Sequence, residues 1–138
     1  MSLKKRPVIR LLFDGGSRGN PGPGYGTYRV DLPEGNFFYD SLEFGRRMTN
    51  NEAEYQTLLT ALDTLIPLLR NTGKDPRNYK LEVMGDSALV LSQVSGAWKA
   101  RKERMRHLRD QVRERLSQFG EYELIRVPRS LSVRYLGH

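Results

Sequence analysis

The sequence predicts one α/β domain, residues 1–138, built on a mixed five-stranded sheet flanked by helices. Apolar segments with the two-residue period of strands are interrupted, after the third, by segments with the period of a helix. The resulting order is three strands, a helix, a strand, two helices and a last strand. Strands connected through helices tend to run parallel and strands joined by turns antiparallel, so the sheet is mixed. The length of 138 residues suits one domain with a proper core.

The first three strands are predicted to form an antiparallel meander. Residues 8–13 are an apolar run that reads as a buried strand. Residues 25–30 and 36–44 alternate well enough to form two more strands, and a turn near residues 32–35 joins them. The connection between the first two strands is rich in glycine, so the backbone there can approach a ligand closely.

The longest helix is predicted to begin where the sequence period changes, at Thr49 or Asn50, either of which can cap it. Apolar side chains then recur three or four residues apart from Tyr55 to Leu69. Pro67 is expected to kink or tighten the last turns. This stripe should cover one face of the sheet.

The second half of the chain continues the alternation. Residues 71–78 contain Gly and Pro and read as a loop, residues 81–85 as a strand, and residues 87–95 as a short helix. Residues 122–127 form the final strand. Between them lies a second amphipathic helix, whose apolar positions are Met105, Leu108, Val112, Leu116 and Phe119.

Three isolated carboxylates stand in different local contexts. Asp14 follows the first strand, Glu54 lies near the start of the long helix, and Asp86 ends the fourth strand. Taken singly, each has an ordinary explanation as a turn residue or a charge that compensates the helix dipole. Together they fit a site for a hard divalent cation, since Mg²⁺ takes oxygen ligands from a few carboxylates and from substrate phosphate.

The three carboxylates lie in motifs that resemble one family. The motifs are residues 14–23, DGGSRGNPGP, residues 49–55, TNNEAEY, and residues 85–87, GDS, which Leu89-Val90 follows. In this order they resemble ribonuclease H type 1, the nucleases that cut the RNA strand of an RNA/DNA hybrid. The resemblance runs from about Val8 to Arg129, with a weaker match at residues 96–99, GAWK. It implies the ribonuclease H-like fold, in a short bacterial or archaeal-like form without a clear basic protrusion.

The resemblance also implies a reaction. It assigns the catalytic, metal-binding roles to Asp14, Glu54 and Asp86, with Mg²⁺ or Mn²⁺ as cofactor. Asp14 would bridge two metal ions, and Glu54 and Asp86 would each bind one. Two ions about 3.5–4 Å apart can activate a water and stabilise the leaving 3′-oxygen. The products would carry a 5′-phosphate.

Substrate contacts are implied by the same resemblance. The glycine-rich segment would approach the 2′-hydroxyls that distinguish RNA from DNA. The residues that the family pattern places against the hybrid are Gly15, Gly16, Ser17, Arg18, Asn20, Thr49, Asn50, Asn51, Ser87, Trp98, Lys99, Lys102 and Arg106. Alternatives remain open: Asn50 and Asn51 can instead cap the helix, and a lone Trp is more often a packing residue.

The charge favours a polyanionic partner. The formal net charge is +7, and residues 99–115 hold eight Lys or Arg against three acids. Lys102, Arg106, Arg109 and Arg113 recur at helical spacing and are predicted to form one basic stripe. The alternative is a solvated helix face with internal ion pairs.

The C-terminal segment departs from the family pattern. Family members continue into a helix that carries an Asn and a fourth Asp, but here Ser132 and Leu136 stand at those positions, and no acid follows Glu123. We therefore expect the last helix to be missing. Three explanations compete: three ligands suffice, the end of the chain or its gene is altered, or the protein has lost much of its rate.

The function expected is endonucleolytic hydrolysis of the RNA strand of RNA/DNA hybrids. The alternatives are a weakened or inactive module that binds hybrid or double-stranded RNA and, more distantly, a ribonuclease H-like nuclease that acts on DNA. The chain has no cysteine and no stretch typical of a signal peptide or a membrane span. We expect a cytoplasmic monomer that does not bind membranes.

Overall fold

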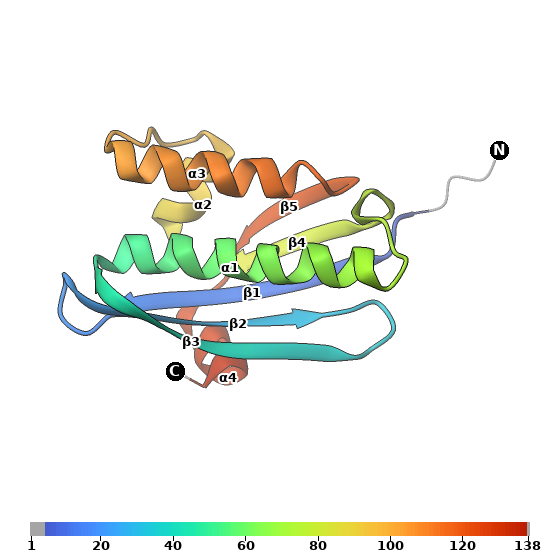
Figure 1. Ribbon diagram of the computed structural model, residues 1–138, viewed down its shortest axis with the longest axis horizontal. Helices are drawn as coiled ribbons and strands as arrows, with labels where there is room; N and C mark the ends of the chain where they lie inside the picture. The colour runs from blue at the N-terminus through green and yellow to red at the C-terminus, as the bar shows by residue number, and fades with distance from the viewer. Residues whose placement is uncertain (1–4, 138) are drawn as a thin grey trace.

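The computed structural model describes residues 5–137 and consists of one sheet with helices on both faces (Figure 1). The strands are β1 (Val8–Ser17), β2 (Gly22–Asp31), β3 (Phe37–Met48), β4 (Lys80–Gly85) and β5 (Glu121–Arg126). The helices are α1 (Asn50–Asn71), α2 (Ala88–Ser95), α3 (Glu103–Leu116) and α4 (Arg129–Leu136), with a 3₁₀ turn, η1 (Pro76–Asn78), before β4. The five predicted strands and three predicted helices are confirmed in their predicted order.

The sheet is mixed, as predicted, with the strand order β3-β2-β1-β4-β5. β1 and β3 run antiparallel to β2, whereas β4 is parallel to both β1 and β5. In the parallel pair, Leu12 lies opposite Met84. Two residues further along, these neighbouring chains reach Asp14 and Asp86, so the sheet delivers two carboxylates to one edge of the fold.

Helix α1 covers the face of the sheet that carries Ile9, Leu11 and Phe13 (Figure 1). The predicted apolar stripe is buried here, and the helix continues through Pro67. The buried side chains of α1 are Ala53, Tyr55, Thr57, Leu58, Leu59, Ala61, Leu62, Leu65, Ile66 and Leu69. Within residues 5–137, no helix is long and apolar enough to cross a bilayer.

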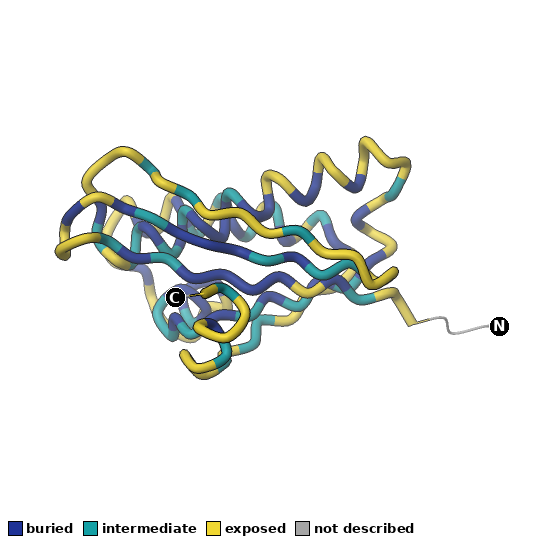
Figure 2. The backbone as a smooth tube through the Cα atoms, turned by 90° about the horizontal axis from the view of Figure 1, so that it is seen from below, coloured by how far each residue is buried: buried dark blue, intermediate teal, exposed yellow. Residues whose placement is uncertain are grey.

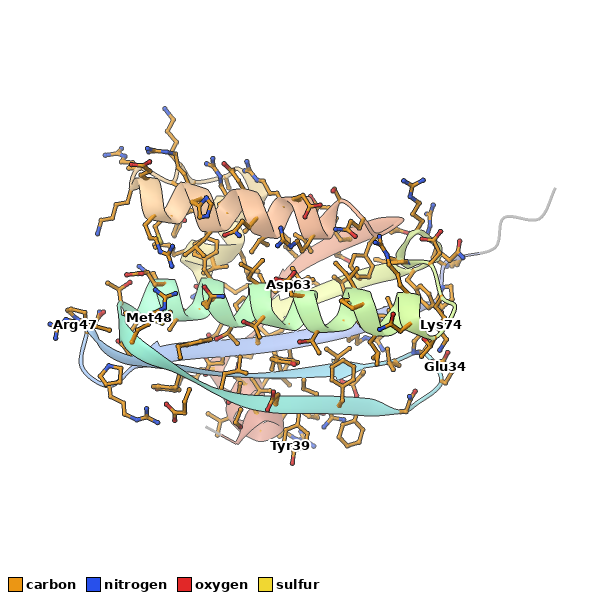
Figure 3. All side chains as sticks on the ribbon, in the orientation of Figure 1. Glu34, Tyr39, Arg47, Met48, Asp63 and Lys74 are labelled. Atoms are coloured by element: carbon orange, nitrogen blue, oxygen red, sulfur yellow. The ribbon has the colours of Figure 1, made fainter. Side chains whose placement is uncertain are left out.

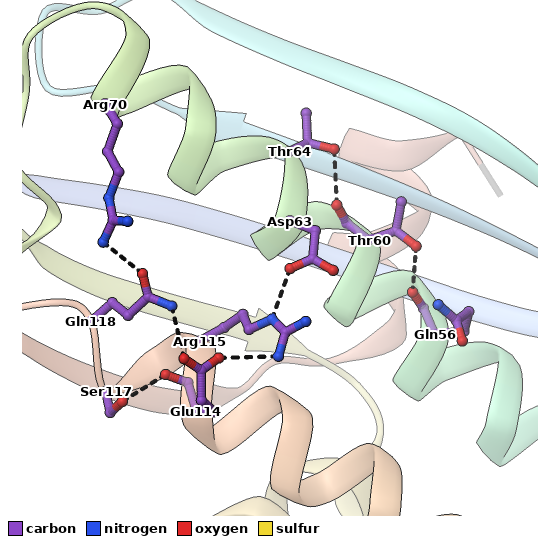
Figure 4. Close-up of polar contacts among 9 residues, drawn as sticks. All are labelled: Gln56, Thr60, Asp63, Thr64, Arg70, Glu114, Arg115, Ser117 and Gln118. Carbon is purple, nitrogen blue, oxygen red and sulfur yellow. Dashed lines mark hydrogen bonds and ion pairs between the residues drawn. The ribbon is translucent and has the colours of Figure 1, made fainter.

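Helix α3 packs beside α1 through its own apolar face and through polar contacts at its C-terminal end (Figure 4). Arg115 Nε on α3 lies 2.8 Å from Asp63 Oδ1 on α1, and Arg70 Nη2 donates to Gln118 Oε1 at 2.8 Å. These groups lie at the surface, so burial of the apolar face contributes most of the stability of the contact.

The glycine-rich segment is more regular than the sequence predicts. Gly15, Gly16 and Ser17 belong to β1, and β2 begins at Gly22, so only four residues connect the two strands. The paired backbone explains this, because the register of β1 with β2 continues to Ser17. The first two strands therefore form a long hairpin that extends past Asp14.

The predicted absence of a C-terminal helix is wrong. Pro128 is the N-terminal cap of α4, and Gly137 ends the helix with φ +81°. The eight residues between them form two turns that lie against β1 and β2, on the face opposite α1 (Figures 1 and 2). Ser132 is fully buried there. The prediction depended on the missing acid, but a short helix needs only backbone freedom, a termination signal and a surface to pack on.

The rest of the outer sheet face remains open. Most of β3 is exposed (Figure 2), and Tyr39, which extends outward from the sheet in Figure 3, is 67% exposed. Arg29 lies over the Phe37 ring, 4.0 Å from its centroid, and also approaches the ring of Tyr135 on α4. This layer of aromatic and guanidinium groups borders α4.

Candidate active site

The three predicted carboxylates meet at one point. Asp14 comes from β1, Glu54 from the first turns of α1, and Asp86 from the residue after β4. One carboxylate oxygen from each lies within 4.8 Å of the others. They line a cleft of about 520 Å³ that also contains Gly15 and Gly16. In residues 5–137 no fourth acid joins this cluster.

Gly15 is the residue that lets α1 approach β1 closely enough to form this cluster. A Cβ at position 15 would lie 2.7 Å from the backbone carbonyl of Ala53 and 2.8 Å from the backbone nitrogen of Glu54. Only a glycine leaves room for that contact. The helix therefore sets Glu54 directly over the strand that carries Asp14.

Burial gives Glu54 an unusual acidity. Loss of solvent raises its pKa to about 7, a hydrogen bond from Ser87 opposes the rise, and the negative charges of Asp14 and Asp86 add to it. Asp14 itself is only 4% exposed. Three carboxylates in such a site repel one another unless a cation joins them, so the donor set fits a hard divalent ion held by oxygen ligands.

Arg129 also reaches the cluster, although no sequence motif predicts it in the site. It is the first residue of α4, and its Nη1 lies 3.3 Å from Asp86 Oδ2 and 3.6 Å from Asp14 Oδ2. The neighbouring Arg126 instead donates from Nε to the backbone oxygen of Asp86 at 3.3 Å. The only sequence signal for Arg129 was the Val127-Pro128-Arg129 motif. That motif indicated where the family's C-terminal helix would begin and did not predict a contact with the carboxylates.

Asn50 connects the hairpin turn to α1. Ser17 donates to Asn50 Oδ1 from its backbone nitrogen at 2.9 Å and from Oγ at 3.0 Å. The Asn50 backbone nitrogen donates in turn to Asn20 Oδ1 at 3.1 Å. Arg18 makes two hydrogen bonds to Glu43 on β3, at 2.7 and 2.8 Å. These predicted substrate residues therefore have structural partners within the protein.

Thr49 caps α1. Its hydroxyl accepts from the Glu52 backbone nitrogen, while the Glu52 side chain accepts from the Thr49 backbone nitrogen, which makes a capping box. Glu52 also pairs with Arg104 on α3 at 3.5 Å. Because Thr49 is the cap, Asn50 and Asn51 do not cap α1. Asn51 and Ser87 line the carboxylate cleft.

A second hollow, of about 540 Å³, adjoins the carboxylate cleft at Asn51 and Leu89. Its lining is strongly basic on the α3 side, where the residues are Lys99, Arg101, Lys102 and Arg104. Asn20 and Thr49 line the opposite side. Trp98 is 52% exposed, so it is not a core residue, and stacking on a substrate sugar or packing at the rim of the hollow both stay open.

The predicted basic stripe on α3 divides into two parts. Lys102 and Arg106, at the helix start, are exposed. Arg113 instead points into the protein, where Nε donates to Val94 O at 2.9 Å and Nη2 to Gln93 O at 3.1 Å. It therefore satisfies carbonyls at the end of α2, and the prediction that all four cations form one stripe is wrong.

Comparison with known proteins identifies the family of this chain. Residues 13–133 match the family described as "Reverse transcriptase-like". The crystal structure of RNase H1 from the archaeon Halobacterium salinarum superimposes with a TM-score of 0.78 at 34% identity, covering 92% of this chain and 90% of that chain. The chain belongs to the ribonuclease H type 1 family.

Two further ribonuclease H structures have the same fold. The N-terminal RNase H domain of Rv2228c from Mycobacterium tuberculosis gives a TM-score of 0.80 at 32% identity, covering 94% of this chain and 93% of that chain. LC11-RNase H1, crystallised in complex with an RNA/DNA hybrid, gives 0.78 at 26% identity, with 91% and 89% coverage. The predicted ribonuclease H-like fold with its mixed five-stranded sheet is confirmed, apart from the C-terminal helix.

The full-length relatives are longer than this ribonuclease H chain. The ribonuclease HI of H. salinarum is 34% identical over 126 residues, which are 91% of this chain and 59% of that protein. The bifunctional protein Rv2228c is 36% identical over 118 residues, which are 85% of this chain and 30% of that protein. This chain thus spans less than two thirds of either relative.

Proposed function

We propose that this protein is a divalent-metal-dependent endonuclease that hydrolyses the RNA strand of RNA/DNA hybrids. The observation that carries the proposal is the convergence of Asp14, Glu54 and Asp86, with oxygens within 4.8 Å of one another. Membership of the ribonuclease H type 1 family supports it. LC11-RNase H1, a relative crystallised with an RNA/DNA hybrid, supports the substrate class.

The carboxylates would hold Mg²⁺ or Mn²⁺, which when bound supplies an activated water and stabilises the leaving 3′-oxygen. Asp14 is buried on a central strand and would be the shared ligand, with Glu54 and Asp86 on either side. Because burial and its neighbours raise the pKa of Glu54 to about 7, this carboxyl holds a proton for much of the neutral range. It would release that proton when it becomes a ligand.

The hairpin and the basic hollow would recognise the two strands of the hybrid. The backbone of Gly15 and Gly16 lines the cleft beside the carboxylates, where an RNA 2′-hydroxyl could be read. Ser17, Asn20 and Asn50 would hold that backbone in place through the hydrogen bonds between them. A backbone held in this position beside the carboxylates would favour RNA over DNA as the strand that is cut.

The DNA strand would lie along the second hollow. Lys99 and Lys102 line it, and Arg106 follows one turn later on α3. Trp98, which precedes Lys99 in the sequence, is exposed, so a sugar could stack on its ring. Phosphate contacts of this kind make binding depend on salt. We further propose that residues 1–138 form one domain and that the protein works as a cytoplasmic monomer; the lack of cysteine is consistent with that location.

The test is incubation of the protein with hybrid labelled on the RNA strand, alongside the matching DNA duplex and double-stranded RNA. We expect internal cuts in the RNA of the hybrid with Mg²⁺ or Mn²⁺, products ending in 5′-phosphate, and no cleavage with EDTA. Leu136 and the three-acid cluster favour a second candidate, a binding module. Tight hybrid binding with no cleavage in either metal would establish that candidate and refute the nuclease.

A further inference from the structure

We propose that Arg129 is the resident counter-cation of the acidic cluster, and that a divalent metal ion displaces its guanidinium in order to bind. The inference rests on the proposed metal site but concerns a residue that the family motifs do not assign to it. The guanidinium is the one cationic group within ion-pair distance of two cluster carboxylates among residues 5–137, at 3.3 Å from Asp86 and 3.6 Å from Asp14.

The position of the side chain allows it to leave. The side chain of Arg129 is 64% exposed, whereas that of Asp14 is 5% exposed. The guanidinium therefore lies over the mouth of the cluster and is not packed inside it. Arg129 begins α4 immediately after Pro128, so the charged group can swing outward on its own stem while the helix stays against the sheet.

The same position makes the guanidinium a competitor of the metal. Its Nη1 atom forms ion pairs with one oxygen each of Asp14 and Asp86. Carboxylate oxygens are also the ligands that a hard cation requires, so the guanidinium and the metal compete for them. A divalent ion carries twice the charge and sits closer, at about 2.1 Å for Mg²⁺, so it wins the exchange. Each ion bound must nevertheless break the existing ion pairs, which weakens the apparent affinity.

The cluster retains part of its charge imbalance even with Arg129 present. The oxygens of Asp14, Glu54 and Asp86 lie within 4.8 Å of one another, and the Arg129 guanidinium brings one positive charge to them. One guanidinium therefore does not neutralise three carboxylates. The site therefore still attracts a divalent ion, which can approach the cluster before it displaces the guanidinium.

The experiment is a titration of the substrate-free protein with Mn²⁺, followed by the electron paramagnetic resonance signal of the free ion and, for Mg²⁺, by calorimetry. Arg129→Ala and Arg129→Gln should bind the ion about two- to fivefold more tightly than the native protein, since an ion pair of this exposure contributes up to about that factor. Arg129→Gln keeps the stem and its packing, which guards against a folding defect in the Ala variant. Arg129→Lys should remain near the native affinity.

The matched control is Arg126→Ala. Arg126 is an arginine of the same region that contacts the backbone oxygen of Asp86 and no cluster carboxylate. If the effect were a general lowering of positive charge, both variants would tighten binding equally, and that result would overturn the proposal. Adding Asp14→Asn to Arg129→Ala should abolish the gain, which assigns the binding to the cluster.

Unchanged or weaker affinity in both Arg129→Ala and Arg129→Gln would also overturn it, as would binding undetectable in every variant. Because the titration contains no nucleic acid, its result is independent of cleavage. A protein that binds hybrids without cutting them would refute the proposed nuclease activity and leave the measured competition intact.

Discussion

The position of Glu54 suits metal binding but lowers the stability of the metal-free fold. Its carboxyl is placed against β1 by the contact between Ala53 and Gly15, and that placement removes it from solvent. A buried carboxylate without a cation is costly, and neighbouring acids increase the cost. A metal ion bound by Glu54, Asp14 and Asp86 would remove this free-energy cost.

The pH dependence of stability follows from Glu54. Its folded pKa, about 7, lies above the ordinary value of 4.5, so the folded state binds an extra proton between those values. The contribution to stability is therefore complete below about pH 4.5 and is lost as the pH rises to about 7, by a total on the order of 3 kcal/mol. Urea unfolding in EDTA from pH 5 to 8 measures it, with Glu54→Gln as the control that lacks the titrating group. Parallel stability curves for the two proteins would contradict this prediction.

Arg129 shows what residue-level sequence reasoning misses. The three acids were predictable because each stands in a distinctive motif, at Asp14, Glu54 and Asp86. Arg129 stands in a motif, Val127-Pro128-Arg129, that does not indicate a contact with the acids, because that contact depends on the direction in which α4 leaves the sheet. That direction is set by packing across the chain and has no local pattern.

At the scale of elements, the contact between β1 and α1 determines whether the site exists. Gly15→Ala would place a methyl group 2.7 Å from the α1 backbone, where neither partner can move without shifting a whole element. We expect a loss of about 1–3 kcal/mol in the free energy of unfolding, together with weakened metal binding because Glu54 moves away from Asp14. Chemical denaturation and a metal titration measure both effects. Gly35→Ala is the control, since nothing lies within 4 Å there, although its φ of +96° adds some strain of its own.

Helix α3 combines two tasks that its sequence does not distinguish. Replacing Lys102 and Arg106 with Ala should weaken hybrid binding and reduce the slope of log affinity against log salt by about one to two. Arg113→Ala should leave that slope unchanged and lower stability by about 1–3 kcal/mol, because the carbonyls at the end of α2 lose their donors. Filter binding at several salt concentrations, with thermal unfolding alongside, tests the division. If the salt slope fell equally in the Lys102/Arg106 double variant and in Arg113→Ala, Arg113 would also contact the hybrid and this division would be wrong.

Helix α4 is the element that sequence reasoning failed to predict. Its apolar residues are few, so it has little periodicity of its own, and its stability depends on packing against β1 and β2. The strands and the two longer helices were predictable because their patterns repeat over many residues. The exact ends of β1 and β2 were not predictable from the sequence, because the two strands stay paired beyond their apolar segments.

At the scale of the whole molecule, the strand order brings distant motifs together. The parallel pairing of β1 with β4 places Asp14 and Asp86 at one edge, and α1 adds Glu54 from one face of the sheet while α4 adds Arg129 from the other. The basic hollow beside this edge gives a positively charged protein a path for a polyanion. Sequence motifs predicted which acids would meet, and the topology explains how.

The role of the three carboxylates is tested by measuring cleavage and binding of one labelled hybrid in Mg²⁺. The proteins compared are the native chain and the variants Asp14→Asn, Glu54→Gln and Asp86→Asn. Asp63→Asn, an exposed acid on α1 that pairs with Arg115, is the control. We expect each cluster variant to lose cleavage to background while hybrid affinity changes by no more than a few fold, and the control to cut normally. Ordinary turnover by any one of the three cluster variants would remove that residue from the site and contradict the account.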